Sequence, residues 1–192
     1  MVASLTSGFV ESQRQELLMN YAVAFLAFVT LQRLAELVWG AHNTVRLLAS
    51  GGVEFGRKHY GAMVAMNLAW LAGLWFWGHD RPVHFAFVII FALLQCARLW
   101  VLMSLGRRWT TRVIVLPGMS PVVSGPYRVV KHPAYIIGIA ETVVVPMTLG
   151  MPIWAALFFG FNVIGLPIRI RAENRALDWA NRHSGASEAK AG

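Results

Sequence analysis

The sequence contains little cysteine and little charge. Cys96 is the one cysteine in 192 residues, so the chain can form no internal disulfide and offers no set of thiolates to bind a metal. Charged residues make up 14% of the chain and apolar residues 57%, whereas a soluble domain has roughly 25% and 45–50% of these. The composition therefore excludes a disulfide-stabilised secreted fold and argues against a solvated globule.

The motifs of several common enzyme classes are also absent. The six histidines never occur as HxxxH or HExxH, and no serine lies in GxSxG, so neither a metal site nor a serine nucleophile is predicted. The glycine-rich segment 51–56 does not have the GxGxxG spacing of a dinucleotide-binding turn. Any cofactor must therefore be bound in another way.

Long apolar segments dominate what is present. Segments 17–39, 60–77 and 83–104 are each close to the roughly 20 residues that cross a bilayer. Segments 134–149 and 151–168 are shorter, contain prolines and are separated by a single glycine, which is typical of a short helical hairpin. The sequence thus predicts an all-α integral membrane protein with about five transmembrane helices, the last two forming the hairpin.

The chain shows no sign of division into several domains. No long repeat and no low-complexity linker interrupts it. Residues 184–192 are small and polar, and we expect them to form a disordered tail. Residues 1–183 are therefore predicted to form a single membrane domain.

Basic residues are unevenly distributed between the apolar segments. Thirteen of the 17 Lys and Arg residues lie in 40–59, in 105–133 or beyond residue 168. With five spans these regions face one side, and the positive-inside rule makes that side cytoplasmic, with the N-terminus outside and the C-terminus in the cytoplasm. The net charge of +8 is then explained by membrane orientation. We predict contacts with membrane lipids, no binding of nucleic acid and no protein partner.

Four ionisable residues lie within the apolar segments, where each is costly unless it is paired or hydrated. Arg33 and Glu36 are three residues apart and share a helix face. They either neutralise each other near the end of the first span or line a polar cavity. Arg98 either anchors its span or forms a pair, with Glu141 as a candidate partner. Glu141 has apolar neighbours, so we expect it to be protonated or to face a site.

Two polar stretches flank the fourth and fifth segments. Residues 124–135 open with a Gly-Pro turn, and His132 precedes a proline, which disfavours helix at His132. Backbone N–H groups, the imidazole and two phenols then meet at a helix N-terminus, which suits an anionic group, although an ordinary interfacial loop has the same pattern. In residues 169–175, Arg169 and Glu173 are four apart, which by itself indicates a surface ion pair.

These two stretches also carry a family resemblance. The first reads GPYRVVKHPAY over residues 125–135, and the second reads RIRAEN from Arg169. The sequence thereby resembles the isoprenylcysteine carboxyl methyltransferase family, whose hallmarks are GPYxxxRHPxY and a later RIxxEE. Two positions depart from them: Lys131 replaces an arginine and loses its planar fork, and Asn174 replaces the second glutamate. Upstream segments, including LGRRWTTR at 105–112, look like a bacterial branch that methylates alkylpyrones or alkylresorcinols.

The resemblance implies an integral membrane methyltransferase that uses S-adenosylmethionine in a cytoplasm-facing pocket, with a lipophilic acceptor entering sideways between helices. The residues it implies for cofactor binding are Arg112, Met119, Ser120, Pro121, Val122, Tyr127, His132, Pro133, Ala134, Tyr135 and Glu173. It places Arg169 at the acceptor, where we expect this residue to hold the reacting oxygen. Glu141 is a candidate catalytic base, and Glu36 and His59 are candidates for acceptor binding or as bases.

The predicted activity is O-methylation of a long-chain alkylpyrone or alkylresorcinol hydroxyl by a multi-pass protein of a bacterial inner membrane. One alternative acceptor is the carboxylate of an isoprenylated cysteine. A second alternative is an NADPH-dependent membrane reductase. A third is a small transporter or scaffold, in which the buried charges would form a polar path.

Overall fold

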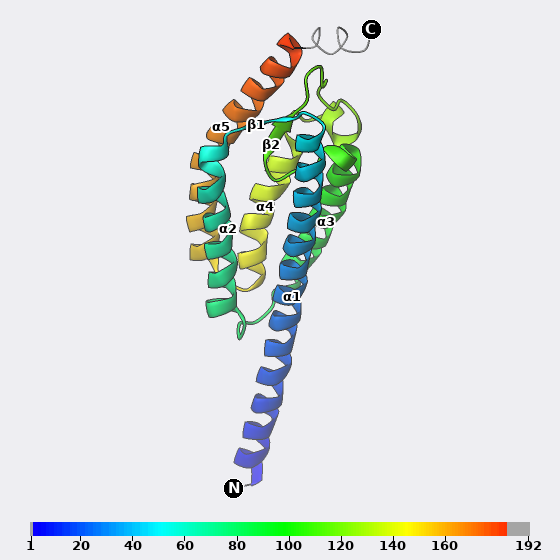
Figure 1. Cartoon of the computed structure of the whole chain (residues 1–192). Helices are drawn as coiled ribbons and strands as arrows, with labels where there is room; N and C mark the ends of the chain where they lie inside the picture. Colours follow the sequence, from blue (N-terminus) through cyan, green and yellow to red (C-terminus); the bar gives the residue numbers. More distant parts are fainter. Residues whose placement is uncertain (1, 184–192) are drawn as a thin grey trace.

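The computed structural model describes residues 2–183 (Figure 1). Side-chain surroundings are not described for residues 2–12, 14, 15, 17, 18, 58 and 59. The tail over 184–192, which we expected to be disordered, lies outside the described residues. So does the side chain of His59, the candidate for acceptor binding.

Five α-helices make up most of the described chain and confirm the predicted all-α membrane architecture. They are α1 Val2–Ala49, α2 Arg57–Gly78, α3 Phe85–Leu105, α4 Pro133–Thr148 and α5 Pro152–Arg182. Four of them contain apolar stretches long enough to cross a membrane, and α4 is a shorter apolar helix. The 16 residues of α4 extend about 24 Å, less than the roughly 30 Å of a hydrocarbon core.

Two helices continue past the ends of the predicted apolar segments. The helix α1 runs to Ala49 rather than ending near residue 39, and α5 runs to Arg182 rather than ending near residue 168. The added part of α5 is rich in Arg and Ala, which favour helix without being apolar. The last two helices are therefore unequal in length, and the basic stretch that begins at Arg169 lies on α5 itself.

A two-stranded antiparallel ribbon, which the sequence did not predict, lies at one end of the bundle (Figure 1). The strand β1 Val53–Phe55 pairs with β2 Val113–Val115, so that Glu54 lies opposite Ile114. Strands of three residues are too short to show a clear alternation of apolar and polar residues. The ribbon packs on the C-terminal part of α5 through an apolar group formed by Phe55, Val113, Val115, Ala176, Leu177, Trp179 and Ala180.

The main apolar core joins all five helices and the α4–α5 connection. Its buried members are Ala22, Leu26, Val29, Trp70, Leu74, Phe91, Val145, Leu149, Met151 and Phe158. Within it, Gly73 allows α5 to approach α2, because a Cβ atom at Gly73 would lie 2.0 Å from the Trp154 ring. The Trp154 indole also donates a 3.3 Å hydrogen bond to the Trp70 carbonyl. Trp154 therefore fills the space between α2 and α5 at the end of the bundle away from the ribbon.

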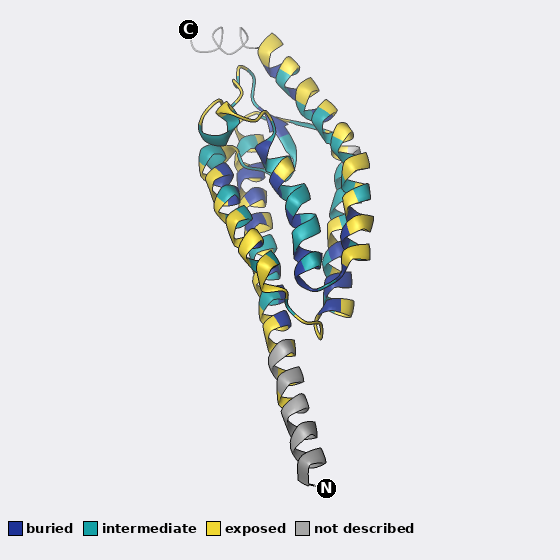
Figure 2. Ribbon diagram, turned by 180° about the vertical axis from the view of Figure 1, so that it is seen from behind, coloured by how far each residue is buried: buried dark blue, intermediate teal, exposed yellow. Residues whose placement is uncertain are grey.

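Many residues on the outward faces of the helices are exposed (Figure 2), and large apolar residues are among them. Phe76, Met103 and Ile153 are 73%, 72% and 84% exposed, respectively. Apolar surface on this scale is rare on a soluble monomer, whereas it is expected where a helix contacts lipid. The exposure pattern thus agrees with a protein that spans the membrane several times.

Candidate functional site

The loop before α4 holds the first group of predicted site residues. A short 3₁₀ helix, η2, covers Gly125–Arg128 and carries Tyr127. Gly125 has a φ of +58°, and a Cβ atom there would lie 2.2 Å from the Ser104 hydroxyl, so only glycine lets η2 pack this closely on α3. His132 is non-helical, with φ −134° and ψ 61°, as expected for a residue before proline. Pro133 then begins α4.

The predicted residues of this loop and those of α5 lie together. The Tyr135 hydroxyl donates a 2.7 Å hydrogen bond to Glu173 Oε2. His132 Nδ1 lies 3.6 Å from the same oxygen, and the His132 ring stacks on Tyr135 with centroids 5.5 Å apart. We call Tyr127, His132, Tyr135, Arg169 and Glu173 the Tyr135–Glu173 cluster.

Arg169 joins this cluster through an aromatic ring. Its guanidinium carbon lies 4.8 Å from the centroid of Tyr135, a cation–π contact. The spacing of Arg169 and Glu173 indicated a surface ion pair, but both residues instead contact Tyr135. Arg169 and Glu173, one turn apart on α5, thus both contact Tyr135 in the first turn of α4.

The phenol of Tyr127 is kept neutral. Burial raises the pKa of Tyr127 to about 12, and the negative charge of Glu173 adds to the shift. Because the phenolate form is disfavoured, Tyr127 contributes an aromatic face and a hydroxyl at neutral pH. It is not suited to act as a base.

A second feature is a hollow of about 420 Å³, partly open to solvent, beside the ribbon. We call it the ribbon hollow; it is lined by Glu54, Phe55, Gly56, Tyr60, Met63, Thr111, Arg112, Val113, Ile168, Arg169 and Ala172. Arg169 lines the hollow and also contacts Tyr135, so this member of the cluster joins the two features.

Polar side chains inside the ribbon hollow are connected to one another. Arg112 Nη1 lies 3.2 Å from both carboxylate oxygens of Glu54, and its guanidinium carbon lies 4.6 Å from the centroid of the Tyr60 ring. The Tyr60 hydroxyl lies 3.2 Å from the Thr111 hydroxyl. Arg112 was predicted to lie near the cofactor; the structure places it with Glu54, in the same hollow as Arg169.

The loop carrying the other predicted cofactor residues connects β2 to η2. Arg108 donates a 2.8 Å hydrogen bond to the carbonyl of Ser120, and the Gly118 amide donates to the carbonyl of Ala180. The first bond ties the loop to the segment that follows α3, and the second ties it to the C-terminal part of α5. Within the loop, Met119 and Val122 are half-buried, whereas Ser120 and Pro121 are exposed.

The ionisable residues within the spans form one network across α1, α3 and α4. Arg98 donates to Glu36 with N···O distances of 2.5 Å and to Glu141 at 2.6 Å, which confirms the pairing of Arg98 with Glu141. Arg33 donates to Glu141 at 2.8 Å, and Gln95 donates to the other Glu141 oxygen at 2.9 Å. Arg33 and Glu36 therefore pair with charged residues of other helices rather than with each other.

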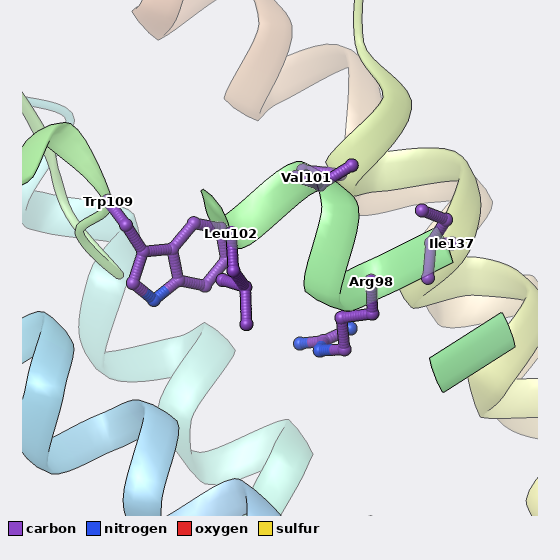
Figure 3. Close-up of a pocket in the computed structure, with 6 residues that line it drawn as sticks. Arg98, Val101, Leu102, Trp109 and Ile137 are labelled. Atoms are coloured by element: carbon purple, nitrogen blue, oxygen red, sulfur yellow. The ribbon is translucent and has the colours of Figure 1, made fainter. Parts of the chain in front are cut away.

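Both carboxylates of this network are already engaged. Each oxygen of Glu36 and of Glu141 accepts at least one hydrogen bond. Arg98 also lines a small pocket of about 180 Å³ between α3 and α4 (Figure 3), with Val101, Leu102, Trp109, Ala134 and Ile137. The network therefore ties three helices together.

Sequence reasoning did not predict the ribbon hollow, although two of its lining residues, Arg112 and Arg169, were predicted site residues. Glu54 lies in a glycine-rich segment whose spacing matched no cofactor motif, and Thr111 lies in a connection without a motif of its own. The only signal was a polar residue, Glu54, between two turn-forming glycines. Pairing of two short strands brings it next to Arg112, 58 positions later in the chain.

Comparisons with known proteins agree with the geometry. The family model for isoprenylcysteine carboxyl methyltransferase (ICMT) matches residues 87–179, which include α4, the Tyr135–Glu173 cluster and most of α3 and α5. A relative from Bacillus subtilis (strain 168), named "Uncharacterized protein YpbQ", is 33% identical over 157 residues, covering 79% of this chain and 94% of the relative. No solved structure matches the chain significantly. The chain belongs to the isoprenylcysteine carboxyl methyltransferase family and is a membrane methyltransferase.

Proposed function

We propose that the protein transfers a methyl group from S-adenosylmethionine to an oxygen of a lipophilic acceptor that enters from the bilayer. The favoured acceptor is the hydroxyl of a long-chain alkylpyrone or alkylresorcinol. The observation that carries the proposal is the hydrogen bond between Tyr135 and Glu173, because it joins the two motif regions into one site. Family membership favours a methyltransferase over the alternatives of a reductase and a transporter.

The cluster offers groups that complement S-adenosylmethionine, which the family's enzymes use. Both contacts of Glu173 are to Oε2, and its side chain is 32% exposed, so the carboxylate can also accept from the ammonium group of the cofactor. His132 and the backbone N–H groups at the start of α4 suit the cofactor's carboxylate. The ring of Tyr127 suits a sulfonium. We therefore propose cofactor contacts from Tyr127, His132, Tyr135 and Glu173.

The remaining cofactor contacts are proposed from the motif positions. Pro133 and Ala134 lie between His132 and Tyr135, and the loop residues Met119, Ser120, Pro121 and Val122 precede η2. Arg112 is proposed to act at the boundary between the cofactor and the acceptor, because it shares the ribbon hollow with Arg169.

Arg169 is proposed to hold the reacting oxygen of the acceptor. S-adenosylmethionine would supply an electrophilic methyl group and would leave as S-adenosylhomocysteine. An acidic enol hydroxyl, as in an alkylpyrone, would already have lost its proton to water, so the protein would mainly need to align the anionic oxygen with the methyl group and to keep water away. The support for this role is that Arg169 contacts Tyr135 and also lines the ribbon hollow. Its fixed positive charge stabilises an oxygen that carries negative charge.

Glu36 and Glu141 have a different proposed role from the one that their positions in the sequence suggested. Their oxygens accept hydrogen bonds from Arg33, Arg98 and two glutamines, and a base needs an accessible oxygen. We propose that they stabilise the bundle. The cytoplasmic orientation of the site and an inner-membrane location are part of the same proposal, on the basis of the 13 basic residues on one side.

The proposal is tested by incubating the purified protein in nanodiscs with radiolabelled methyl donor and candidate acceptors. The expected result is label in an alkylresorcinol or alkylpyrone methyl ether, identified by mass. Label in an isoprenylated cysteine alone would instead favour the carboxylate alternative. No label in any lipid extract would contradict a methyltransferase acting on these acceptors.

The role of Arg169 is tested separately. Arg169→Ala is expected to abolish turnover while cofactor affinity, measured by calorimetry, stays within a few-fold. Arg175→Ala is the matched control, because Arg175 is exposed six residues later on the same helix. An equal loss of cofactor binding and turnover in Arg169→Ala would contradict the assignment to the acceptor.

A further inference from the structure

The ribbon hollow contains one carboxylate and two guanidinium groups. Glu54 projects from β1 with its side chain 13% exposed, and Arg112 pairs with it. Arg169 enters the hollow from α5. Within the hollow, the charge of Arg112 is thus balanced by Glu54, and the charge of Arg169 is left for a ligand. Glu54 can still accept a hydrogen bond from that ligand.

We propose that Glu54 is a specificity-determining residue that accepts a hydrogen bond from a hydroxyl of the acceptor, so that the ribbon hollow selects a hydroxyl-bearing ring over a carboxylate. The inference rests on the proposed function, since it concerns the acceptor of the same reaction. A hydroxyl can donate a hydrogen bond to Glu54 while its oxygen accepts one from Arg169. A carboxylate can only accept, so Glu54 repels it.

Glu54 is distinguished from the other carboxylates near the helices by its surroundings. Glu36 and Glu141 accept hydrogen bonds within the network, and Glu173 accepts from Tyr135 and does not line the hollow. The contacts of Glu54 with Arg112 are long, at 3.2 Å, and both come from a single nitrogen. The Glu54 oxygens therefore have lone pairs left for a ligand.

The backbone holds Glu54 in place. Cross-strand pairing puts it opposite Ile114, and Gly56, with φ +72°, turns the chain directly into α2. A Cβ atom at Gly56 would lie 3.2 Å from Cβ of Ala172, so the turn and α5 are in close contact. The carboxylate is thus fixed relative to Arg169, which lies three residues before Ala172 on α5.

The apolar lining of the hollow fits a ring that carries a long chain. Met63 of α2 and Ile168 of α5 line it beside the polar groups. Ile164, one turn from Ile168 on the same face of α5, is 71% exposed and continues the apolar surface. At the other end Trp154 fills the space between α2 and α5. An acceptor with its head in the hollow can therefore keep its chain along α5 in the bilayer.

The test measures binding of two probes without methyl donor, by quenching of tryptophan fluorescence in nanodiscs. Pentadecylresorcinol presents hydroxyls, and N-acetyl-S-farnesylcysteine presents a carboxylate. Glu54→Gln is expected to weaken pentadecylresorcinol binding by about tenfold, the loss of a hydrogen bond to a charged group. It is expected to tighten binding of the farnesylcysteine severalfold, because the repulsion is removed and Arg112 is freed. Glu16→Gln is the matched control, since Glu16 is exposed on α1.

Opposite changes for the two probes separate recognition from a structural role. Equal weakening of both probes, or no change in either, would overturn the inference. If Glu54→Gln does not fold, Glu54→Asp keeps the charge; it must retain the preference for pentadecylresorcinol, and a loss of that preference overturns the inference. If the wild type binds with this preference but transfers no methyl group, the proposed function fails while the role of Glu54 stands.

Discussion

The hydroxyl of Tyr135 donates a 2.7 Å hydrogen bond to Glu173, a residue 38 positions later in the chain and on another helix. The bond connects the first turn of α4 to the polar part of α5. The guanidinium of Arg169 packs on the ring of the same tyrosine. One side chain thus sets the distance between the proposed cofactor residues and the residue proposed to hold the acceptor.

Removing the Tyr135 hydroxyl is expected to weaken cofactor binding. In Tyr135→Phe the ring keeps its contacts with His132 and Arg169, but Glu173 loses its donor and becomes free to rotate. The loss of a hydrogen bond to a charged group predicts about a tenfold higher Kd for S-adenosylmethionine, measured by calorimetry. Tyr21→Phe is the control, because Tyr21 is exposed on α1. Unchanged affinity in Tyr135→Phe would show that this hydrogen bond does not order the site.

The stability of the protein is expected to fall at high pH because of Tyr127. Its pKa is raised to about 12 in the folded state, against about 10 in an unfolded chain. Between these values the unfolded state binds fewer protons, so the free energy of unfolding decreases as pH rises. Below pH 10 the phenol is protonated in both states, so it does not make the free energy of unfolding depend on pH.

Comparison with Tyr127→Phe isolates this contribution. The wild type is expected to lose thermal stability more steeply than Tyr127→Phe between about pH 10 and 12, and the two are expected to run parallel below pH 10. The readout is the midpoint of thermal unfolding in detergent across a pH series. Parallel curves over the whole range would mean that Tyr127 titrates normally in the folded protein.

The sequence was sufficient to predict the helices and the proximity of the two motifs, but not the ribbon hollow. Long apolar segments set the helices because bilayer thickness imposes their length. His132 before a proline was predictable from local sterics alone. Glu54 and Arg112 meet only because two three-residue strands pair, and such pairing has no local signature. The partners of Arg33 and Glu36 were also hidden, because a helix face shows which residues can pair but not which neighbouring helix supplies the partner.

The network within the spans is expected to stabilise the bundle strongly. In Glu141→Gln, Arg33 and Arg98 keep their positive charges but lose the carboxylate that both contact. Breaking a buried ion pair in this way predicts a loss of about 3–5 kcal/mol, measured by unfolding in detergent. Glu16→Gln, the same change at an exposed site, is expected to alter stability little.

A double-mutant cycle shows whether the network acts as a unit. Glu36 and Glu141 share Arg98, so the effects of Glu36→Gln and Glu141→Gln are expected to be non-additive by at least about 0.5 kcal/mol. Additive effects would mean that the two ion pairs are independent. Full stability in both single variants would contradict a structural role and reopen a catalytic one.

Two glycines near the start of α2 are expected to respond in opposite directions to alanine. Gly56 has a φ of +72° and a Cβ atom there would lie 3.2 Å from Cβ of Ala172, so Gly56→Ala is expected to cost about 1–2 kcal/mol. Gly61 is helical, and a Cβ atom there would meet none of the described residues outside its own helical turn within 4 Å. Gly61→Ala is therefore expected to stabilise by roughly 0.5–1 kcal/mol. Thermal unfolding measures both.

The Gly56 variant also affects the ribbon hollow. Strain at this turn moves β1 away from α5 and takes Glu54 with it, so Gly56→Ala is expected to weaken pentadecylresorcinol binding as well as stability. Gly61→Ala leaves the turn intact and is expected to bind like the wild type. A loss of stability in Gly56→Ala with unchanged binding would mean that the position of Glu54 does not depend on this turn, whereas a joint loss ties recognition of the acceptor to the contact between Gly56 and Ala172.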